Sequence, residues 1–181
     1  MSHEINKQNI FNFLKAESII IEINVTTEIE ILESKNIETD KLQVVKLTTL
    51  NSTSKYWKLD PETTTFLQSK NKKVESIILE HTNDGTLNII LLEMKSKKLK
   101  ETDVEEKFKN SLSWVYILLN LLDGKENQKI KVYGILVAQK NMNWNKNDTL
   151  NILSSTSIRY KKKSFYTPDT SIDIPINDLL I

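Results

Sequence analysis

Residues 74–95 read VESIILEHTNDGTLNIILLEMK, and they are the most informative part of the chain for predicting its fold. Two runs rich in isoleucine and leucine flank an Asn-Asp-Gly sequence at 83–85. Glycine adopts a positive φ without steric strain, and Asp-Gly between apolar runs is a strong hairpin signal. The sequence therefore predicts an antiparallel hairpin with strands at 74–81 and 87–95.

The length of this turn decides which acidic side chains face each other. With a three-residue turn, Glu75 lies opposite Glu93 on one face of the hairpin, with Cβ atoms about 5 Å apart. A two-residue turn would instead place Glu75 opposite Met94, which points to the other face. Asp84, in the turn itself, is separated from Glu93 by eight or nine residues of strand, at roughly 3.3 Å each. We therefore favour the three-residue turn, with Glu75 rather than Asp84 as the partner of Glu93.

A long amphipathic helix follows the hairpin. Thr102 and Asp103 predict its start and Asp123-Gly124 its end, with apolar residues at helical spacing between them. The next segment, 130–138, is almost entirely apolar and predicts a strand that is buried on both faces. A strand, a helix and a strand in this order predict that the two strands are parallel neighbours.

The rest of the chain adds strands and two short helices. Strands are predicted at 18–25, 28–33, 42–50 and 55–59, which we expect to form an extended antiparallel part of the sheet. Short helices are predicted at 1–15 and 60–69, and shorter strand-like pieces at 164–166 and 171–176. The expected fold is a single α/β (α+β) domain spanning 1–181, in which helices flank a mixed central β-sheet.

The composition limits the chemistry that the chain can perform. It has no cysteine and only two histidines, His3 and His81. A hard cation held by carboxylates, Mg²⁺ or Mn²⁺, is therefore the metal chemistry that the sequence supports best. The formal net charge of +1 excludes a global basic field, so any contact with nucleic acid comes from local patches. No segment approaches a membrane-spanning length, and we expect a cytoplasmic protein with no membrane partner.

Glu93 and Lys95 are the residues best suited to catalysis. Side chains alternate along a strand, so both project from one face at the end of an otherwise apolar strand. In that position a carboxylate binds a metal, and an ammonium group polarises a water molecule or a phosphate oxygen. The competing interpretation is an ordinary exposed ion pair at a strand end.

Together these features resemble the PD-(D/E)xK nuclease superfamily, which has the restriction-endonuclease-like fold. In that family an acidic residue opens one strand, a hairpin follows, the next strand ends in (D/E)xK, and a helix packs on the sheet before another strand. The resemblance covers residues 74–138, the nuclease-like core. It implies that Glu75 and Glu93 bind Mg²⁺ or Mn²⁺, that Lys95 positions the attacking water, and that Lys107 on the helix completes the catalytic group. Because the usual Pro-Asp is absent, Glu75 takes the place of its aspartate.

The family resemblance also suggests residues outside this core. The family often supplies a further glutamate from an early helix, for which Glu4 and Glu17 are the candidates. Beside the apolar stripe of the long helix, Ser111 is a second residue, after Lys107, that could face the site.

Basic clusters supply candidate contacts to nucleic acid. One directly follows the Glu-x-Lys strand and the other lies near the C-terminus; they contain Lys97, Lys98 and Lys100, and Arg159, Lys161, Lys162 and Lys163. Lysine and arginine bind phosphates and release counterions, so we expect salt-sensitive binding to DNA or RNA. The alternative for each cluster is a solvated, lysine-rich surface.

The sequence thus predicts a metal-dependent nuclease that hydrolyses phosphodiester bonds in DNA or RNA. Two alternatives remain open. One is a catalytically inactive protein of the same fold that binds nucleic acid or acts as an assembly subunit, and the other is a structural protein-interaction domain. A homodimer or a place in a larger assembly is compatible with all three.

Overall fold

The computed structural model describes residues 20–24, 28–32, 41–59, 61, 72–96, 100–121, 129–140, 147–153 and 156–180. Its strands are β1 (Ile20–Ile23), β2 (Ile29–Leu32), β3 (Val44–Thr48), β4 (Lys55–Leu59), β5 (Ser76–His81), β6 (Thr86–Lys95), β7 (Lys129–Ala138), β8 (Asn147–Leu153), β9 (Thr156–Tyr166) and β10 (Ser171–Pro175). Its helices are α2 (Glu101–Leu121) and α3 (Ile176–Leu179). The helices predicted at 1–15 and 60–69 lie outside the described residues, apart from Pro61 in a turn. No helix within the described ranges is long and apolar enough to cross a membrane.

The main sheet contains seven strands within the described residues, in the order β1-β4-β5-β6-β7-β9-β8. From β1 to β6 each neighbouring pair is antiparallel, whereas β6, β7 and β9 run parallel and β8 returns antiparallel to β9. Helix α2 connects β6 to β7. The predicted strand-helix-strand unit with parallel neighbouring strands is therefore confirmed, as is a mixed α/β sheet.

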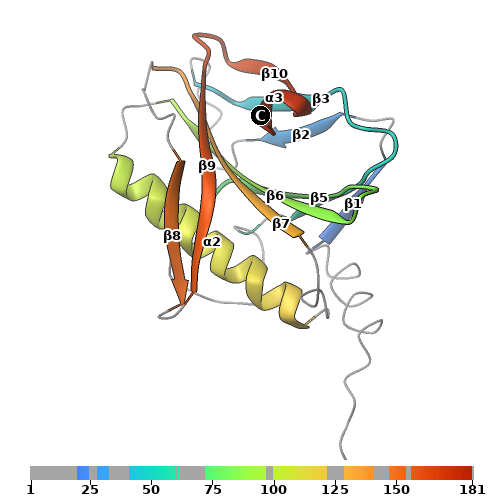
Figure 1. Ribbon diagram of the computed structural model, residues 1–181. Helices are drawn as coiled ribbons and strands as arrows, with labels where there is room; N and C mark the ends of the chain where they lie inside the picture. The colour runs from blue at the N-terminus through green and yellow to red at the C-terminus, as the bar shows by residue number, and fades with distance from the viewer. Residues whose placement is uncertain are drawn as a thin grey trace, which may run out of the picture.

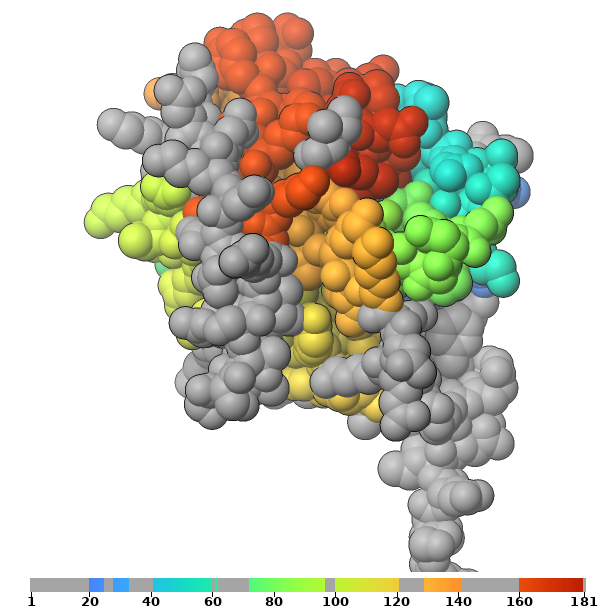
Figure 2. Space-filling model, in the orientation of Figure 1, coloured from blue at the N-terminus to red at the C-terminus, as the bar shows by residue number. Residues whose placement is uncertain are grey.

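A second sheet contains β2, β3 and β10. Strand β2 pairs antiparallel with β3, and β10 pairs parallel with the other edge of β3. Figure 2 shows the C-terminal residues, in red, beside the region of β3, in cyan. The prediction that all four early strands extend one antiparallel sheet is thus wrong, because β2 and β3 leave the main sheet. In β2, Ile29 and Ile31 are buried whereas Glu30 and Leu32 are exposed, so this strand has a single apolar face and suits an outer layer.

The C-terminal strands are longer than the sequence predicts. Strand β9 covers Thr156–Tyr166, of which only 164–166 was predicted, and β8 was missed. Both are rich in polar residues, so their apolar pattern is weak. Pairing with β7 and with each other supplies the backbone hydrogen bonds that define them.

The molecule has three layers. Helix α2 covers one face of the main sheet, and the second sheet covers the other (Figure 1). The alternation of β6 divides its side chains between two cores: Ile89 and Leu91 pack with Phe108 of α2, whereas Ile90 and Leu92 pack with the second sheet. The predicted assignment of β6 side chains to two faces is confirmed.

The hairpin of β5 and β6 has the predicted three-residue turn. The Thr82 N–H donates to the Thr86 carbonyl at 3.0 Å, and the Gly85 N–H donates to the Thr82 carbonyl at 3.0 Å. Gly85 has a φ of 77°, which only glycine adopts readily. The turn therefore sets the register along the whole hairpin.

Helix α2 begins at Glu101, slightly before the predicted cap at Thr102 and Asp103. The Asp103 N–H instead donates to the Lys100 carbonyl at 3.0 Å. The predicted apolar stripe is buried through Val104, Phe108, Leu112, Val115 and Leu119. The predicted helix end at 123–124 lies outside the described residues.

Candidate active site

Glu75 and Glu93 face each other where the β5–β6 hairpin opens toward α2. The two strands pair as far as Ser76 and Leu92, so the same register places the next residues, Glu75 and Glu93, opposite each other. Glu93 is 0% exposed and Glu75 is 8% exposed. The register predicted from the three-residue turn is confirmed.

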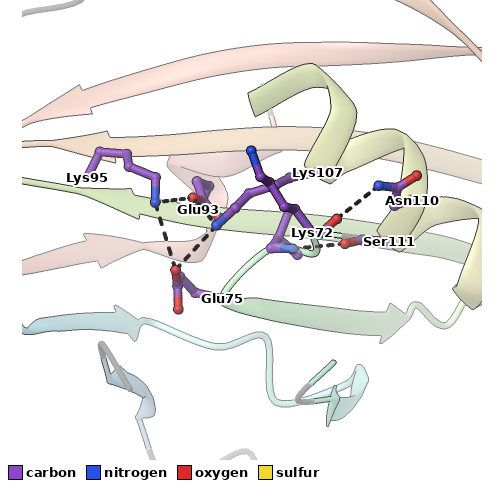
Figure 3. A network of polar contacts seen from close by, with 8 residues as sticks. Lys72, Glu75, Glu93, Lys95, Lys107, Asn110 and Ser111 are labelled. Carbon is purple, nitrogen blue, oxygen red and sulfur yellow. Dashed lines mark hydrogen bonds and ion pairs between the residues drawn. The ribbon is translucent and has the colours of Figure 1, made fainter. Parts of the chain in front are cut away.

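Two lysines bring their ammonium groups to these carboxylates (Figure 3). Lys95 Nζ lies 2.5 Å from Glu93 Oε1, and Lys107 Nζ lies 2.6 Å from the same oxygen. Glu75 Oε1 lies 4.0 Å from Lys95 Nζ and 3.6 Å from Lys107 Nζ. Two carboxylates and two ammonium groups thus meet where no participating side chain is more than 18% exposed. We call these four residues the charged cluster.

Three separate elements supply the charged cluster. Glu93 and Lys95 come from the end of β6, Glu75 comes from the segment just before β5, and Lys107 comes from α2. Lys107 adjoins Phe108 of the buried stripe, so it lies at the margin of the helix face that packs on the sheet. From there its long side chain reaches the end of β6. The structure therefore brings together all four residues expected in the catalytic group.

The carboxylates fix the charge of Lys107. Burial by itself would lower the pKa of Lys107, but the charge of Glu93, its hydrogen bond and the charge of Glu75 together raise this pKa above 10.5. Lys107 is consequently a cation at neutral pH. It can neutralise a carboxylate or a phosphate, but it cannot act as a general base.

One oxygen of Glu93 has no hydrogen-bond partner among the described residues. This oxygen, Oε2, is buried, whereas Oε1 is contacted by both lysines. Burying a carboxylate oxygen without a partner is unfavourable unless a ligand binds it. Mg²⁺ prefers oxygen ligands and usually binds one or two carboxylates, with water and substrate phosphates at the remaining positions. Glu93 and Glu75 fit such a cation, although no three His, Asp or Glu side chains of the described residues gather around one point.

Asp84, the alternative acid, lies at the far end of the hairpin and is fully engaged in the turn. The Thr86 N–H donates to its Oδ1 at 3.1 Å and the Thr86 hydroxyl to its Oδ2 at 3.1 Å, and the Thr82 hydroxyl also contacts Oδ1. Hydrogen bonds from Thr82 and Thr86 lower the pKa of Asp84 to about 2. Asp84 therefore stabilises the turn and takes no part in the charged cluster.

Helix α2 also contacts the segment that carries Glu75. The Val74 N–H donates to Ser111 Oγ at 2.9 Å, and Asn110 Nδ2 donates to the Lys72 carbonyl at 3.0 Å (Figure 3). Ser111 was expected near the site, whereas Asn110 was missed. The spacing of three and four residues from Lys107 places both on the same side of the helix, which is a signal that the sequence does contain.

The predicted nucleic-acid contacts are dispersed. Lys100 is exposed just before α2, whereas Lys97 and Lys98 lie outside the described residues, as do Glu4, Glu17 and the side chain of Arg159. On β9, Lys161 and Lys163 share the sheet face of Tyr133 and Ile135, opposite to that of Glu93.

Lys162 projects to the α2 face but does not contribute to an open basic patch. Its side chain is 3% exposed, its ammonium group contacts Glu105, and it lies 3.7 Å from Glu101 Oε1. Because side chains alternate along a strand, β9 separates Lys162 from Lys161 and Lys163.

No protein-family model matches this chain, and neither a curated protein nor a solved structure matches it.

Proposed function

We propose that this protein is a metal-dependent nuclease that hydrolyses phosphodiester bonds in DNA or RNA. The observation that carries the proposal is the buried Oε2 of Glu93, which accepts no hydrogen bond from the described residues and lies in a charged cluster with Glu75 and two ammonium groups. A buried acidic pair beside cations is the arrangement expected where a divalent cation and a phosphate bind together.

Each side chain of the cluster has a role in this reaction. Glu93 and Glu75 hold Mg²⁺ or Mn²⁺, which when bound lowers the pKa of a water molecule and neutralises charge on the phosphate. Lys95 positions the attacking water and stabilises the charge that develops on the phosphate. Lys107, as a permanent cation, balances the carboxylates and contacts a phosphate oxygen.

The order of elements supports this proposal. An acidic residue precedes β5, a hairpin follows, β6 ends in Glu93-Met94-Lys95, and α2 packs on the sheet before the parallel strand β7. This is the order expected for a PD-(D/E)xK nuclease. Lys100, exposed at the start of α2, and the neighbouring Lys97 and Lys98 supply phosphate contacts.

The test combines Mn²⁺ titration by calorimetry with cleavage assays on single-stranded and duplex DNA and RNA. We expect Glu75→Gln and Glu93→Gln to weaken Mn²⁺ binding and abolish cleavage, because each removes a ligand charge. Lys95→Ala should not weaken metal binding, because an ammonium group repels the metal and cannot ligate it, but it should lose turnover. Asp84→Ala is the control, and it should alter neither binding nor cleavage.

A specific observation favours a second candidate, a catalytically inactive protein of this fold that binds nucleic acid or joins an assembly. The two carboxylates and two lysines already neutralise each other, as a structural ion-pair network does. A wild-type protein that binds nucleic acid at low salt, but neither binds Mn²⁺ nor cleaves any substrate, would establish this alternative and reject the nuclease.

A further inference from the structure

Glu75 directly precedes β5, where the described strand pairing begins. Strand β5 begins at Ser76. Its described pairing with β6 starts at Ser76, and its described pairing with β4 starts at Ile77. The position of its carboxylate beside Glu93 therefore also depends on how the preceding segment is held. Among the described residues, α2 donates to or accepts from the backbone of this segment at two positions.

Two side chains of α2 hold the segment 72–75 from one side. Ser111 is fully buried and its Oγ accepts the Val74 N–H at 2.9 Å, while Asn110 Nδ2 donates to the Lys72 carbonyl at 3.0 Å. Figure 3 shows both contacts beside the charged cluster. The same side of the helix carries Lys107, whose ammonium group lies 3.6 Å from Glu75 Oε1.

We propose that Asn110 and Ser111 are positioning residues that fix the carboxylate of Glu75 relative to Glu93 and so determine the affinity of the cation site. This inference rests on the proposed metal-dependent function. Neither residue contacts the carboxylates, and both act through the backbone of residues 72–74. We call this pair of hydrogen bonds the α2 clamp.

The backbone beside Glu75 contains a buried N–H group whose hydrogen-bond acceptor comes from α2. Val74 is buried, so without the Ser111 hydroxyl its N–H would lose its partner, and the segment would move to find water. Such a movement displaces the Glu75 carboxylate, which directly follows Val74. Residues that orient metal ligands typically change metal affinity by about ten- to a hundredfold when they are removed.

The experiment measures Mn²⁺ affinity of the full chain by calorimetry for Asn110→Ala, Ser111→Ala and Ser111→Thr. Ser113→Ala is the matched control, because the Ser113 hydroxyl donates within its own helix to the Lys109 carbonyl at 2.8 Å. We expect Ser111→Ala to weaken Mn²⁺ binding roughly tenfold, Asn110→Ala to weaken it less, and Ser111→Thr to stay near wild type because it keeps the hydroxyl. Asn110 is only half-buried, so its variant tests the clamp even if Ser111→Ala does not fold.

A double-mutant cycle in urea unfolding provides a second test that needs no metal. If the clamp positions Glu75, part of the loss of stability caused by Asn110→Ala or Ser111→Ala comes from weakened attraction between Glu75 and the two lysines. The change in the unfolding equilibrium constant should then be roughly threefold smaller in a Glu75→Gln background.

The two tests separate the clamp from the nuclease proposal. Metal affinities equal to wild type in both clamp variants would overturn the clamp while the nuclease proposal stands. A wild-type protein that binds no Mn²⁺ would overturn the metal site, and the cycle would then decide the clamp: coupling supports it, and strict additivity rejects it.

Discussion

At the scale of single residues, the charged cluster is defined by its balance of charge. Lys95 and Lys107 share one oxygen of Glu93, and the cluster carries two charges of each sign. A divalent cation entering this site is attracted by the carboxylates and repelled by the ammonium groups. The affinity of the proposed cation site should therefore depend on the lysines, although neither can be a ligand.

We predict that Lys107→Met strengthens Mn²⁺ binding and lowers cleavage. Methionine keeps much of the side-chain length and removes the positive charge. Like charges a few ångströms apart repel by about 1 to 4 kcal/mol, depending on the effective dielectric, so the affinity should rise roughly tenfold or more. Calorimetric titration measures this, with the exposed Lys109→Met on the same helix as the control. An unchanged or weaker affinity would mean that Lys107 does not repel the cation.

A second residue-scale network lies on the opposite face of the main sheet. The Tyr56 hydroxyl donates to Glu80 Oε1 at 2.7 Å, and Asn88 Nδ2 donates to Glu80 Oε2 at 2.6 Å. Burial, together with the hydrogen bond to Glu80, raises the pKa of Tyr56 from 10.0 to about 12. The folded protein therefore holds this proton more tightly than the unfolded chain does.

The sign of the resulting pH dependence follows from linkage. Below pH 10 the tyrosine is protonated in both states, and its stabilising contribution is complete; as pH rises from 10 toward 12, the unfolded state releases the proton first and this contribution is lost. We predict that the free energy of unfolding falls over this range more steeply in wild type than in Tyr56→Phe. Urea unfolding at several alkaline pH values measures the difference. Parallel curves for the two proteins would contradict it.

At the scale of elements, the packing of α2 on the sheet depends on one glycine in β7. A Cβ atom added to Gly134 would lie 2.8 Å from Tyr160 Cε2 and 2.9 Å from Phe108 Cε2. The rings of Phe108 and Tyr160 pack edge to face beside this position, and their centroids lie 6.2 Å apart. The absence of a side chain thus lets β7 pass beneath α2 and beside β9.

We predict that Gly134→Ala destabilises the fold by about 1 to 3 kcal/mol, because both rings are buried and must shift to admit a methyl group. Chemical unfolding measures this loss. The control is Gly85→Ala, whose Cβ would meet nothing within 4 Å, so that its cost arises from the positive φ alone. A Gly134→Ala protein as stable as wild type would show that the rings of Phe108 and Tyr160 shift to admit a methyl group without measurable cost, and would contradict this prediction.

At the scale of the whole molecule, the three layers separate the basic residues. Lys100 lies between β6 and α2 in the sequence, whereas Lys161 projects from the face of the main sheet opposite to that of the charged cluster. A strand cannot present consecutive lysines on one surface, so the cluster at 159–163 is divided by the sheet.

We predict that Lys100→Ala weakens binding to nucleic acid at low salt. It should also reduce the slope of the logarithm of the binding constant against the logarithm of salt concentration by about the amount expected for one phosphate contact. Lys161→Ala should have a smaller effect, because its side chain lies away from the proposed site. Fluorescence anisotropy over a salt series measures both. Equal losses in the two variants, or a larger loss for Lys161→Ala, would place the nucleic acid on another surface.

Much of the fold and the site was predictable because it depends on local pattern. The Asn-Asp-Gly turn fixes the length of the hairpin loop. The alternation of side chains along β6 then places Glu93 and Lys95 on the same face of the sheet as Glu75. The helical stripe that includes Phe108 places Lys107 at the margin of the packed face. These inferences need only neighbouring residues, so a single sequence contains them.

Turn chemistry and apolar periodicity act over a few residues, so the hairpin, its register, the buried helix and the parallel strand that follows it could all be predicted from the sequence alone. Three features became apparent only in the folded molecule: β2 and β3 leave the main sheet, Lys162 pairs with α2, and Asn110 and Ser111 hold the segment before Glu75. The physical reason is that these features depend on contacts between segments distant in sequence. The free energy of such contacts depends on which surfaces meet, and a pattern of residues that are neighbours in sequence does not specify those surfaces.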